Sequence, residues 1–349
     1  MKNKLLLTTA IVGLGLASVA NAQTTVSGNL NIGYKAAGGA VKAQSFDGWT
    51  KESQINIAAK GKLSNGMDYA AGTSLEFDGQ DTLAGTTATS GVGVHTENTY
   101  IDFISGNTTF TISADHIQNS DFSMANISGF ADFTELADGI NGQQAAAIDT
   151  HNSPAGAFGV GVMQKTAVGT ISALFVPSTS NTLMNDITNT ATKGQTGAGN
   201  TGYEIGFRGD LGVKNLDAAV FYNSTDTETP GETTKTSDTK GKMVAAKYTL
   251  PMNLTVAAEH AVNTASTGVD TKTKSAGLSY ALNKELTIGY VYAKTTADAQ
   301  TQDEKIQVVN LGYNLGPVVA NLQITKGENI AYQAAADGDT AFISLTTKF

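Results

Sequence analysis

Apolar and polar residues alternate along most of the chain. In residues 26–34 the side chains of Val26 and Ile32 fall on one face, and those of Ser27 and Asn29 fall on the other. A period of two with one apolar face is typical of a β-strand that separates an apolar from a polar environment. About sixteen such runs predict strands, over residues 26–34, 54–62, 67–77, 97–104, 107–115, 157–165, 168–176, 202–210, 214–223, 241–249, 252–261, 273–281, 285–294, 305–313, 317–325 and 340–349.

The connections between these runs alternate between short and long. The short ones, such as residues 64–66, 105–106 and 250–251, contain the Asn, Gly and Pro residues that suit tight hairpin turns. The runs therefore predict successive hairpins in one domain, with the tight turns at one end of the sheet and the long loops at the other. The long connections are polar and cover residues 35–53, 78–96, 116–156, 177–201, 224–240, 262–272, 295–304 and 326–339.

So many meandering strands in one sheet are expected to close on themselves, because closure removes the unpaired edges. A barrel of this size is too wide for side chains to fill, so it encloses an aqueous channel. The polar face then meets water inside, and the apolar face meets lipid outside. We therefore predict an all-β protein, a transmembrane antiparallel up-and-down β-barrel of about sixteen strands. A secreted soluble sandwich or solenoid is the alternative that alternation alone leaves open.

Tyrosine residues lie near the ends of several runs. Amphipathic rings at the depth of the lipid headgroups form aromatic girdles in membrane barrels, although Tyr is also a favourable residue in any strand. The candidate girdle residues are Tyr34, Tyr248, Tyr280, Tyr290, Tyr292 and Tyr313.

The N-terminal residues indicate export. Two lysines precede an apolar stretch over residues 5–20, which ends in an Ala-Asn-Ala sequence that fits the small-x-small cleavage pattern. We predict a signal peptide over residues 1–22 and a barrel domain over residues 23–349. A short membrane anchor is the alternative, but the apolar stretch is shorter than a membrane-spanning helix needs.

Composition narrows the function. Without the two lysines of the signal peptide, 20 basic residues stand against 31 acidic ones, a net charge of −11 that argues against nucleic acid as a partner. The chain has no Cys, and its four His residues are scattered without metal-ligand spacing. The mature chain contains neither a nucleophile elbow nor a phosphate-binding glycine loop. The sequence therefore predicts no enzyme, no cofactor and no metal site.

The signal peptide, the opening run 26–34 and the terminal run 341–349 resemble those of Gram-negative general porins. The resemblance covers essentially the whole mature chain. In that family the last strand ends in Phe, which the outer-membrane assembly machinery recognises, and Phe349 holds that position here. The resemblance implies an outer-membrane location and a homotrimer of sixteen-stranded barrels, each with its own pore.

The longest connection, residues 116–156, is the third long loop. In general porins this loop folds into the lumen and narrows it, so the resemblance implies the same here. Five acids and no base in one loop produce a negative local potential, which favours cations in a confined channel. An external loop whose charges serve solubility is the alternative. The acids are Asp121, Asp132, Glu135, Asp138 and Asp149.

Charges on the polar faces of the runs are the candidate pore-wall residues. The family sets a cluster of bases against the acidic loop, but the chain has a single Arg, Arg208, and Asp115 stands near the place where many relatives carry an Arg. Anion preference is therefore in doubt. Lys60 and Lys62 serve equally well as rim charges. The candidate wall charges are Lys60, Lys62, Asp68, Glu76, Asp102, Asp115 and Arg208.

The sequence thus predicts a porin through which small hydrophilic solutes and ions diffuse passively, with a weak preference for cations. The expected partners are outer-membrane lipid, the barrel-assembly machinery and two further copies of the chain. Two alternatives stay open. One is a substrate-selective channel, for which Phe221 and Phe342 are the candidate inward aromatics, with Trp49 expected in a loop. The other is a surface or adhesive barrel that conducts little.

Overall fold

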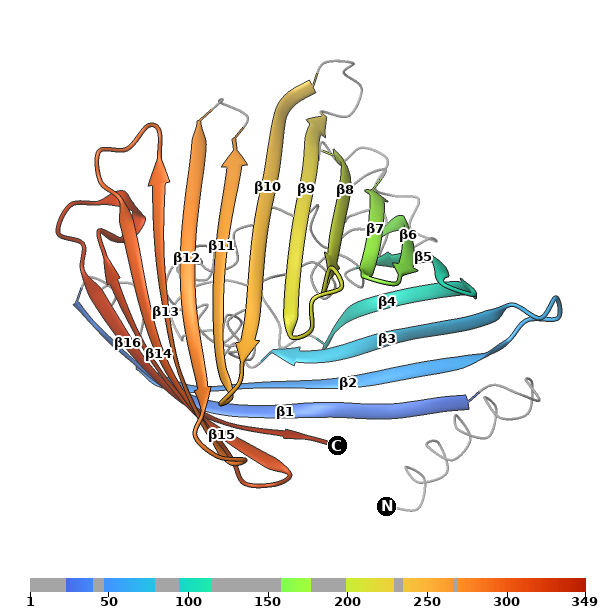
Figure 1. Cartoon of the computed structure of the whole chain (residues 1–349), viewed down its shortest axis with the longest axis horizontal. Coiled ribbons are helices and arrows are strands. Elements are labelled where there is room, and N and C mark those ends of the chain that lie inside the picture. Colours follow the sequence, from blue (N-terminus) through green and yellow to red (C-terminus); the bar gives the residue numbers. More distant parts are fainter. Residues whose placement is uncertain are drawn as a thin grey trace.

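The described part of the chain is almost entirely β-structure (Figure 1). The computed structural model describes residues 23–39, 47–78, 94–114, 158–176, 199–228, 235–265 and 269–349. The strands are β1 (Gln23–Gly38), β2 (Gly48–Lys62), β3 (Asp68–Asp78), β4 (Val94–Ser105), β5 (Thr108–Ala114), β6 (Phe158–Thr166), β7 (Gly169–Val176), β8 (Gly199–Gly209), β9 (Leu216–Glu228), β10 (Lys235–Leu250), β11 (Leu254–Thr264), β12 (Asp270–Ala281), β13 (Leu286–Ala297), β14 (Glu304–Asn314), β15 (Val318–Glu328) and β16 (Gly338–Lys348), with one 3₁₀ turn, η4 (Ile330–Tyr332).

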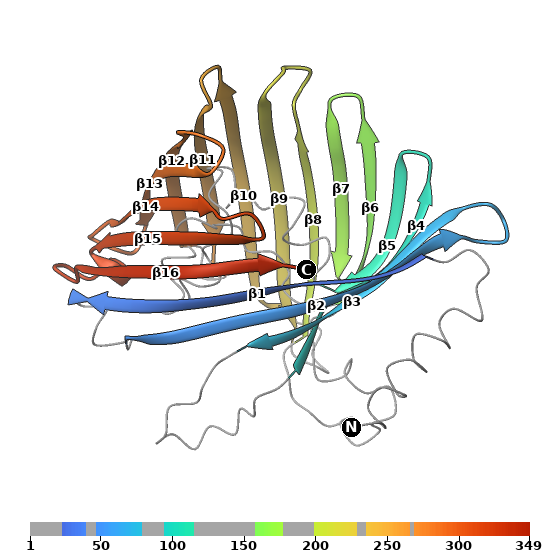
Figure 2. The same ribbon diagram turned by 90° about the horizontal axis from the view of Figure 1, so that it is seen from below.

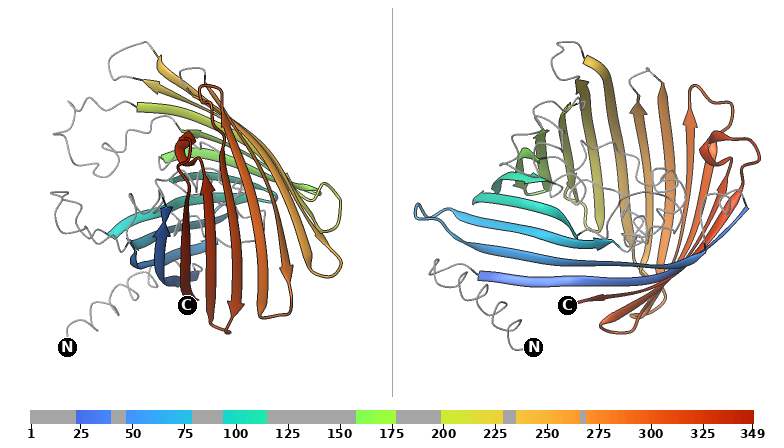
Figure 3. Two further views of the ribbon diagram at one scale, coloured as in Figure 1. Left: turned by 90° about the vertical axis from the view of Figure 1, so that its left-hand side faces the viewer. Right: turned by 180° about the vertical axis from the view of Figure 1, so that it is seen from behind.

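The strands form a closed barrel in which each strand pairs antiparallel with its neighbours in sequence and β16 pairs with β1. The tight turns that join β4 to β5, β6 to β7 and β8 to β9 lie along one edge of the wall (Figure 2). The two further views show the wall curving from β1 around to β16 (Figure 3). The predicted sixteen-stranded up-and-down barrel is therefore confirmed.

The burial of side chains alternates along the strands, as a barrel wall requires. Side chains on the concave face crowd against one another, whereas those on the convex face stay accessible. On β16, for example, Thr340, Phe342 and Ser344 are buried, and the intervening Ile343 and Leu345 are exposed. The exposed set is strongly apolar, which suits contact with lipid rather than water. It includes Leu30, Ile32, Ile57, Ile101, Phe110, Ile112, Val160, Ile171, Phe175, Ile205, Val220, Val244, Leu278, Ile288, Val309, Leu311, Ile324, Ile343 and Leu345.

Tyrosines mark both ends of this apolar surface. Tyr248, Tyr280 and Tyr313 lie at outward-facing positions beside the tight turns. Tyr34 and Tyr292 lie outward in the part of β1 and β13 that leads to the long loops. Two levels of amphipathic rings that bracket an apolar band are the arrangement of interfacial girdles.

Several strands are longer than the sequence pattern predicts. Residues 35–53 were expected to form a loop, but β1 continues to Gly38 and β2 begins at Gly48, so Trp49 lies in a strand and packs edge-on against Tyr34, with ring centroids 5.4 Å apart. The predicted loop 224–240 is likewise mostly strand. These segments are polar on both faces, so they carry no period-two signal, yet their backbone hydrogen bonds continue the hairpins.

The first and last strands meet at a backbone-paired seam. The N–H of Gly28 donates to the carbonyl of Phe349 at 2.8 Å, and the N–H of Phe349 donates to the carbonyl of Gly28 at 2.9 Å. The ring of Phe349 lies over Gly28, where an added Cβ would come within 2.6 Å of Phe349 Cζ. The C-terminal residue thus takes part in closing the barrel. Among the described residues, no helix is long and apolar enough to cross a membrane.

Candidate functional site: the barrel lumen

Acidic side chains lie on the inward-facing side of the barrel wall. They occupy the buried positions of the alternating pattern, on five different strands. Glu204 on β8 is only 1% exposed, and Glu259 lies near the middle of β11. A ring of carboxylates distributed around a wall sets the sign of the potential in the enclosed space. The set is Glu76, Asp102, Glu204, Glu259 and Glu304.

Most basic residues on inward-facing positions gather at the tight-turn end, and Lys35, on the inward face of β1 near the long loops, is the exception among the described residues. Lys348 is the last residue of β16, Lys165 precedes the β6–β7 turn, and Lys247 lies close to the β10–β11 turn. Arg208 is the penultimate residue of β8. The described wall is therefore polarised, because most of its bases lie at one mouth whereas acids also occupy the middle and the long-loop end.

Arg208 is held in an ion-pair cluster with Asp217 and Lys247. Its Nε donates to Asp217 Oδ1 at 3.0 Å, and its Nη2 donates to Oδ2 at 2.7 Å, while Lys247 Nζ lies 3.5 Å from Oδ2. Two-point pairing of a guanidinium with a carboxylate is the strong form of this interaction. Lys247 was not singled out from the sequence, because β10 carries apolar residues such as Met243 and Val244 on both faces near it.

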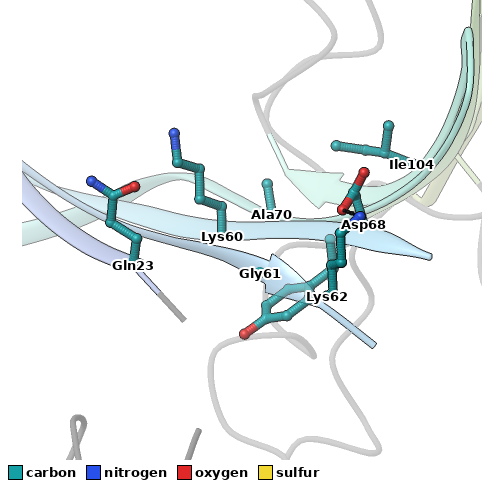
Figure 4. Close-up of a pocket in the computed structure, with 8 residues that line it drawn as sticks. Gln23, Lys60, Gly61, Lys62, Asp68, Ala70 and Ile104 are labelled. Carbon is teal, nitrogen blue, oxygen red and sulfur yellow. Dashed lines mark hydrogen bonds and ion pairs between the residues drawn. The ribbon is translucent and has the colours of Figure 1, made fainter. Parts of the chain in front are cut away.

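Lys60, Lys62 and Asp68 lie at the β2–β3 turn rather than in the middle of the wall. Lys62 Nζ pairs with Asp68 Oδ1 at 2.6 Å, and both side chains are exposed. Lys60 and Gln23 are register partners whose side chains extend to the same side of the sheet (Figure 4), and both line a pocket of 590 Å³. The placement makes these residues part of one mouth of the barrel. The pocket is lined by Gln23, Lys60, Gly61, Lys62, Asp68, Tyr69, Ala70 and Ile104.

The inward face also carries apolar patches that sequence reasoning missed. One patch on β7, β9 and β10 includes Leu174, Val176, Phe221 and Met243, all buried. A second on β13 and β14 consists of Val291, Ala293, Ile306 and Val308. The alternation of these strands is apolar on both faces, so the pattern gives no sign of which face is inside. Phe221 and Phe342, the candidate inward aromatics, are 3% and 4% exposed and so offer little ring surface to a solute.

The remaining sequence-predicted site residues lie outside the described residues. They are Asp115 and the loop acids Asp121, Asp132, Glu135, Asp138 and Asp149. The predicted signal peptide, residues 1–22, also lies outside the described residues. In the part of the chain that the structure describes, no cluster of three or more His, Asp or Glu side chains is arranged to hold a metal ion.

Known proteins that resemble this chain were identified by sequence and by fold. A search of curated proteins found no match. The fold is similar to that of an anion-selective porin from Comamonas acidovorans, with 13% identity, a TM-score of 0.63 and coverage of 94% of this chain and 100% of that one. It is equally similar to the outer membrane channel DcaP of Acinetobacter baumannii, with 11% identity, a TM-score of 0.63 and coverage of 95% and 99%.

A third structure of the same fold is a trimer form of OmpT, an outer membrane protein of Vibrio cholerae, with 11% identity, a TM-score of 0.58 and coverage of 94% and 100%. The sequence itself matches a family model described as Gram-negative porin over residues 8–330. This match spans nearly the whole chain and agrees with the closed sixteen-stranded barrel. The chain belongs to the Gram-negative porin family.

Proposed function

We propose that this outer-membrane channel lets small hydrophilic solutes and ions diffuse passively and weakly prefers cations. The observation that carries the proposal is the ring of inward-facing acids, Glu76, Asp102, Glu204, Glu259 and Glu304. In a confined aqueous pore such a ring favours cations through its field. The mature net charge of −11 has the same sign.

The inward bases at the tight-turn mouth oppose this field, and two of them are offset locally. The single Arg shares its guanidinium with Asp217, and Lys62 is paired with Asp68. The other bases of this mouth, Lys60, Lys165, Lys247 and Lys348, leave it positive, so the proposed preference is weak and rests on the acids in the middle and at the long-loop end of the wall.

We infer that the long connection after β5 enters the lumen and lines its narrowest part. The support is the inward apolar patch of Leu174, Val176, Phe221 and Met243. Such a patch facing a water-filled channel would be unfavourable without a covering segment. The 116–156 segment contains apolar residues able to cover it, and its five acids and absence of bases would then add to the negative field.

The rest of the proposal concerns assembly. We propose that residues 1–22 are removed on export, that the assembly machinery reads the strand ending in Phe349, and that the barrel forms a homotrimer. The trimer rests on the fold likeness to OmpT of Vibrio cholerae in its trimer form. Transport by diffusion requires no covalent chemistry, so no catalytic or cofactor-binding role is proposed for any residue.

Conductance in a planar bilayer under a salt gradient tests the function. The mature protein is extracted and added to one side, and the reversal potential is recorded for single openings. Stepwise ohmic openings in groups of three, with a cation-sided reversal potential, are expected. An anion-sided potential would overturn the selectivity, whereas a folded, heat-modifiable barrel without conductance would favour the adhesive alternative.

A further inference from the structure

Lysines form a row on the outward face of the barrel, across neighbouring strands near the long loops. Lys274 on β12 is the direct register partner of Lys294 on β13, and Lys294 is the direct partner of Lys305 on β14. Lys326 on β15 is the register partner of Gln307, which lies two residues from Lys305 on the same face of β14. All four side chains occupy positions that alternate with buried inward ones. We call these four residues the lysine row.

Like charges directly opposite each other on adjacent strands are unfavourable. Two carboxylates offset part of the repulsion. Asp303 Oδ2 lies 2.6 Å from Lys294 Nζ, and Glu328 is shared between Lys305 and Lys326 at the longer distances of 3.4 and 3.6 Å.

Lys274 forms no ion pair within the described residues, and its other register partner is His260, another basic side chain. On the same face, Lys272 lies two residues from Lys274 and pairs with Asp298 at 2.9 Å and Asp270 at 3.9 Å. Five lysines of this exposed surface therefore stand against four carboxylates, which leaves one positive charge in excess. Ammonium groups in excess of carboxylates, at fixed spacing on adjacent strands, are suited to bind an anion.

The lysine row begins where the apolar band ends. Along the outward face of β13 the residues run Ile288, Tyr290, Tyr292 and then Lys294, away from the tight turn. This order passes from lipid-facing through interfacial to charged side chains, so the ammonium groups lie at the depth of lipid headgroups. Long loops of outer-membrane barrels face the cell exterior, so the headgroups are those of the outer leaflet.

We propose that the lysine row binds the phosphate groups of an outer-leaflet lipid that carries more than one phosphate. Adjacent strands are about 4.8 Å apart, so the row from Lys274 to Lys305 spans about 10 Å, which accommodates two phosphates of one headgroup. The apolar and tyrosine surface directly below receives the acyl chains of the same molecule. This surface favours a lipid over free phosphate, which has nothing to place there. The inference concerns the outer face and is independent of the proposed ion preference.

Binding of fluorescent lipopolysaccharide to the extracted full-length barrel in non-ionic detergent tests the proposal. The triple variant Lys274→Gln, Lys294→Gln, Lys305→Gln is expected to bind about tenfold more weakly or worse, because each basic residue near an anionic lipid surface contributes to affinity. Enzymatically dephosphorylated lipopolysaccharide should bind the unchanged protein as weakly as the intact lipid binds the variant. Equal affinity of the triple variant and the unchanged protein would overturn the proposal.

Matched variants separate this site from general charge. The double variant Lys214→Gln, Lys284→Gln removes positive charge from two tight turns, away from the pore wall, and should leave binding unchanged. Replacement of the three lysine-row residues by Arg should keep the affinity. Heat-modifiable gel mobility and unchanged conductance verify that each variant is folded. Competition by inorganic pyrophosphate at concentrations as low as those of the lipid would overturn the lipid assignment.

Discussion

Arg208 and Asp217 form a two-point ion pair across the β8–β9 hairpin, with Nε 3.0 Å from Oδ1 and Nη2 2.7 Å from Oδ2. Lys247 on the next strand lies 3.5 Å from the same carboxylate. The only Arg of the chain is thus committed to a neighbouring strand, and one acid compensates two bases at the tight-turn mouth. The charge of this mouth therefore depends strongly on one residue.

Replacement of Asp217 by Asn should shift the channel toward anions. Arg208 and Lys247 would both lose their carboxylate partner, so the mouth would gain one positive charge. Because the pair is partly exposed, we expect a loss of about 1 kcal/mol in stability. The reversal potential in a salt gradient measures the shift. Asp298→Asn, which removes a charge paired with the outward-facing Lys272 at 2.9 Å, is the control and should leave selectivity unchanged.

Replacement of Gly28 by Ala should weaken barrel closure. The added Cβ would come within 2.6 Å of Phe349 Cζ and 2.5 Å of the Gln54 carbonyl oxygen, so the ring or the seam must move. Overpacking of this kind costs about 1–3 kcal/mol. Urea unfolding, followed by the heat-modifiable band on a gel, gives the midpoint.

Gly48→Ala is the matched control for the seam, because an added Cβ there meets nothing within 4 Å. Both substitutions replace a strand glycine by the same residue, so the intrinsic strand preference is equal. If the two variants unfold at the same urea concentration, the ring of Phe349 has no part in holding the first and last strands together.

Neutralisation of Glu204 and Glu259 by Gln should reduce the cation preference. Both carboxylates lie on the inward face near the middle of their strands. Gln keeps nearly the same volume, so the pore size is preserved and only the field changes. We expect the permeability ratio of cations to anions to fall while the total conductance changes little. An unchanged ratio would place the selectivity elsewhere, with the loop acids the next residues to substitute.

The sequence allowed the sixteen strands and the closure to be predicted because each side of the wall meets a different medium. Strands that face lipid on one side and water on the other, such as β16, alternate cleanly. The pattern failed at the ends of β1 and β2, where a loop was predicted over residues 35–53, and in two further places. The ends of β9 and β10 extend past the apolar band and are polar on both faces, and β7 is apolar on both faces around Leu174.

The positions of the inward-facing acids and of the lysine row could be predicted only in part from the alternation of apolar and polar residues. Alternation identifies which acids face inward, such as Glu204, but it gives no depth along the pore axis. Depth depends on the register between strands, which hairpin lengths and the tilt of the barrel determine together. The lysine row was missed because Lys274, Lys294 and Lys305 are far apart in sequence and become neighbours only through register.

A charge inserted at Leu278 tests which face of the wall meets lipid. Leu278 is 44% exposed on the outward face of β12, between Val256 and Tyr290 on the adjacent strands. Arg in the middle of the lipid-facing band costs about 2–4 kcal/mol in membrane barrels. The free energy of unfolding of Leu278→Arg in lipid vesicles should therefore fall by that amount.

Ser275→Arg on the same strand is the comparison, because Ser275 faces inward and is the register partner of Glu259. There the guanidinium meets water and a carboxylate, so stability should hardly change while conductance and cation preference fall. In detergent, where the outer face is less strictly apolar, the penalty at Leu278 should shrink. If Ser275→Arg were the more destabilising variant, the apolar face would be the interior. The result would then favour a soluble β-protein over a membrane barrel.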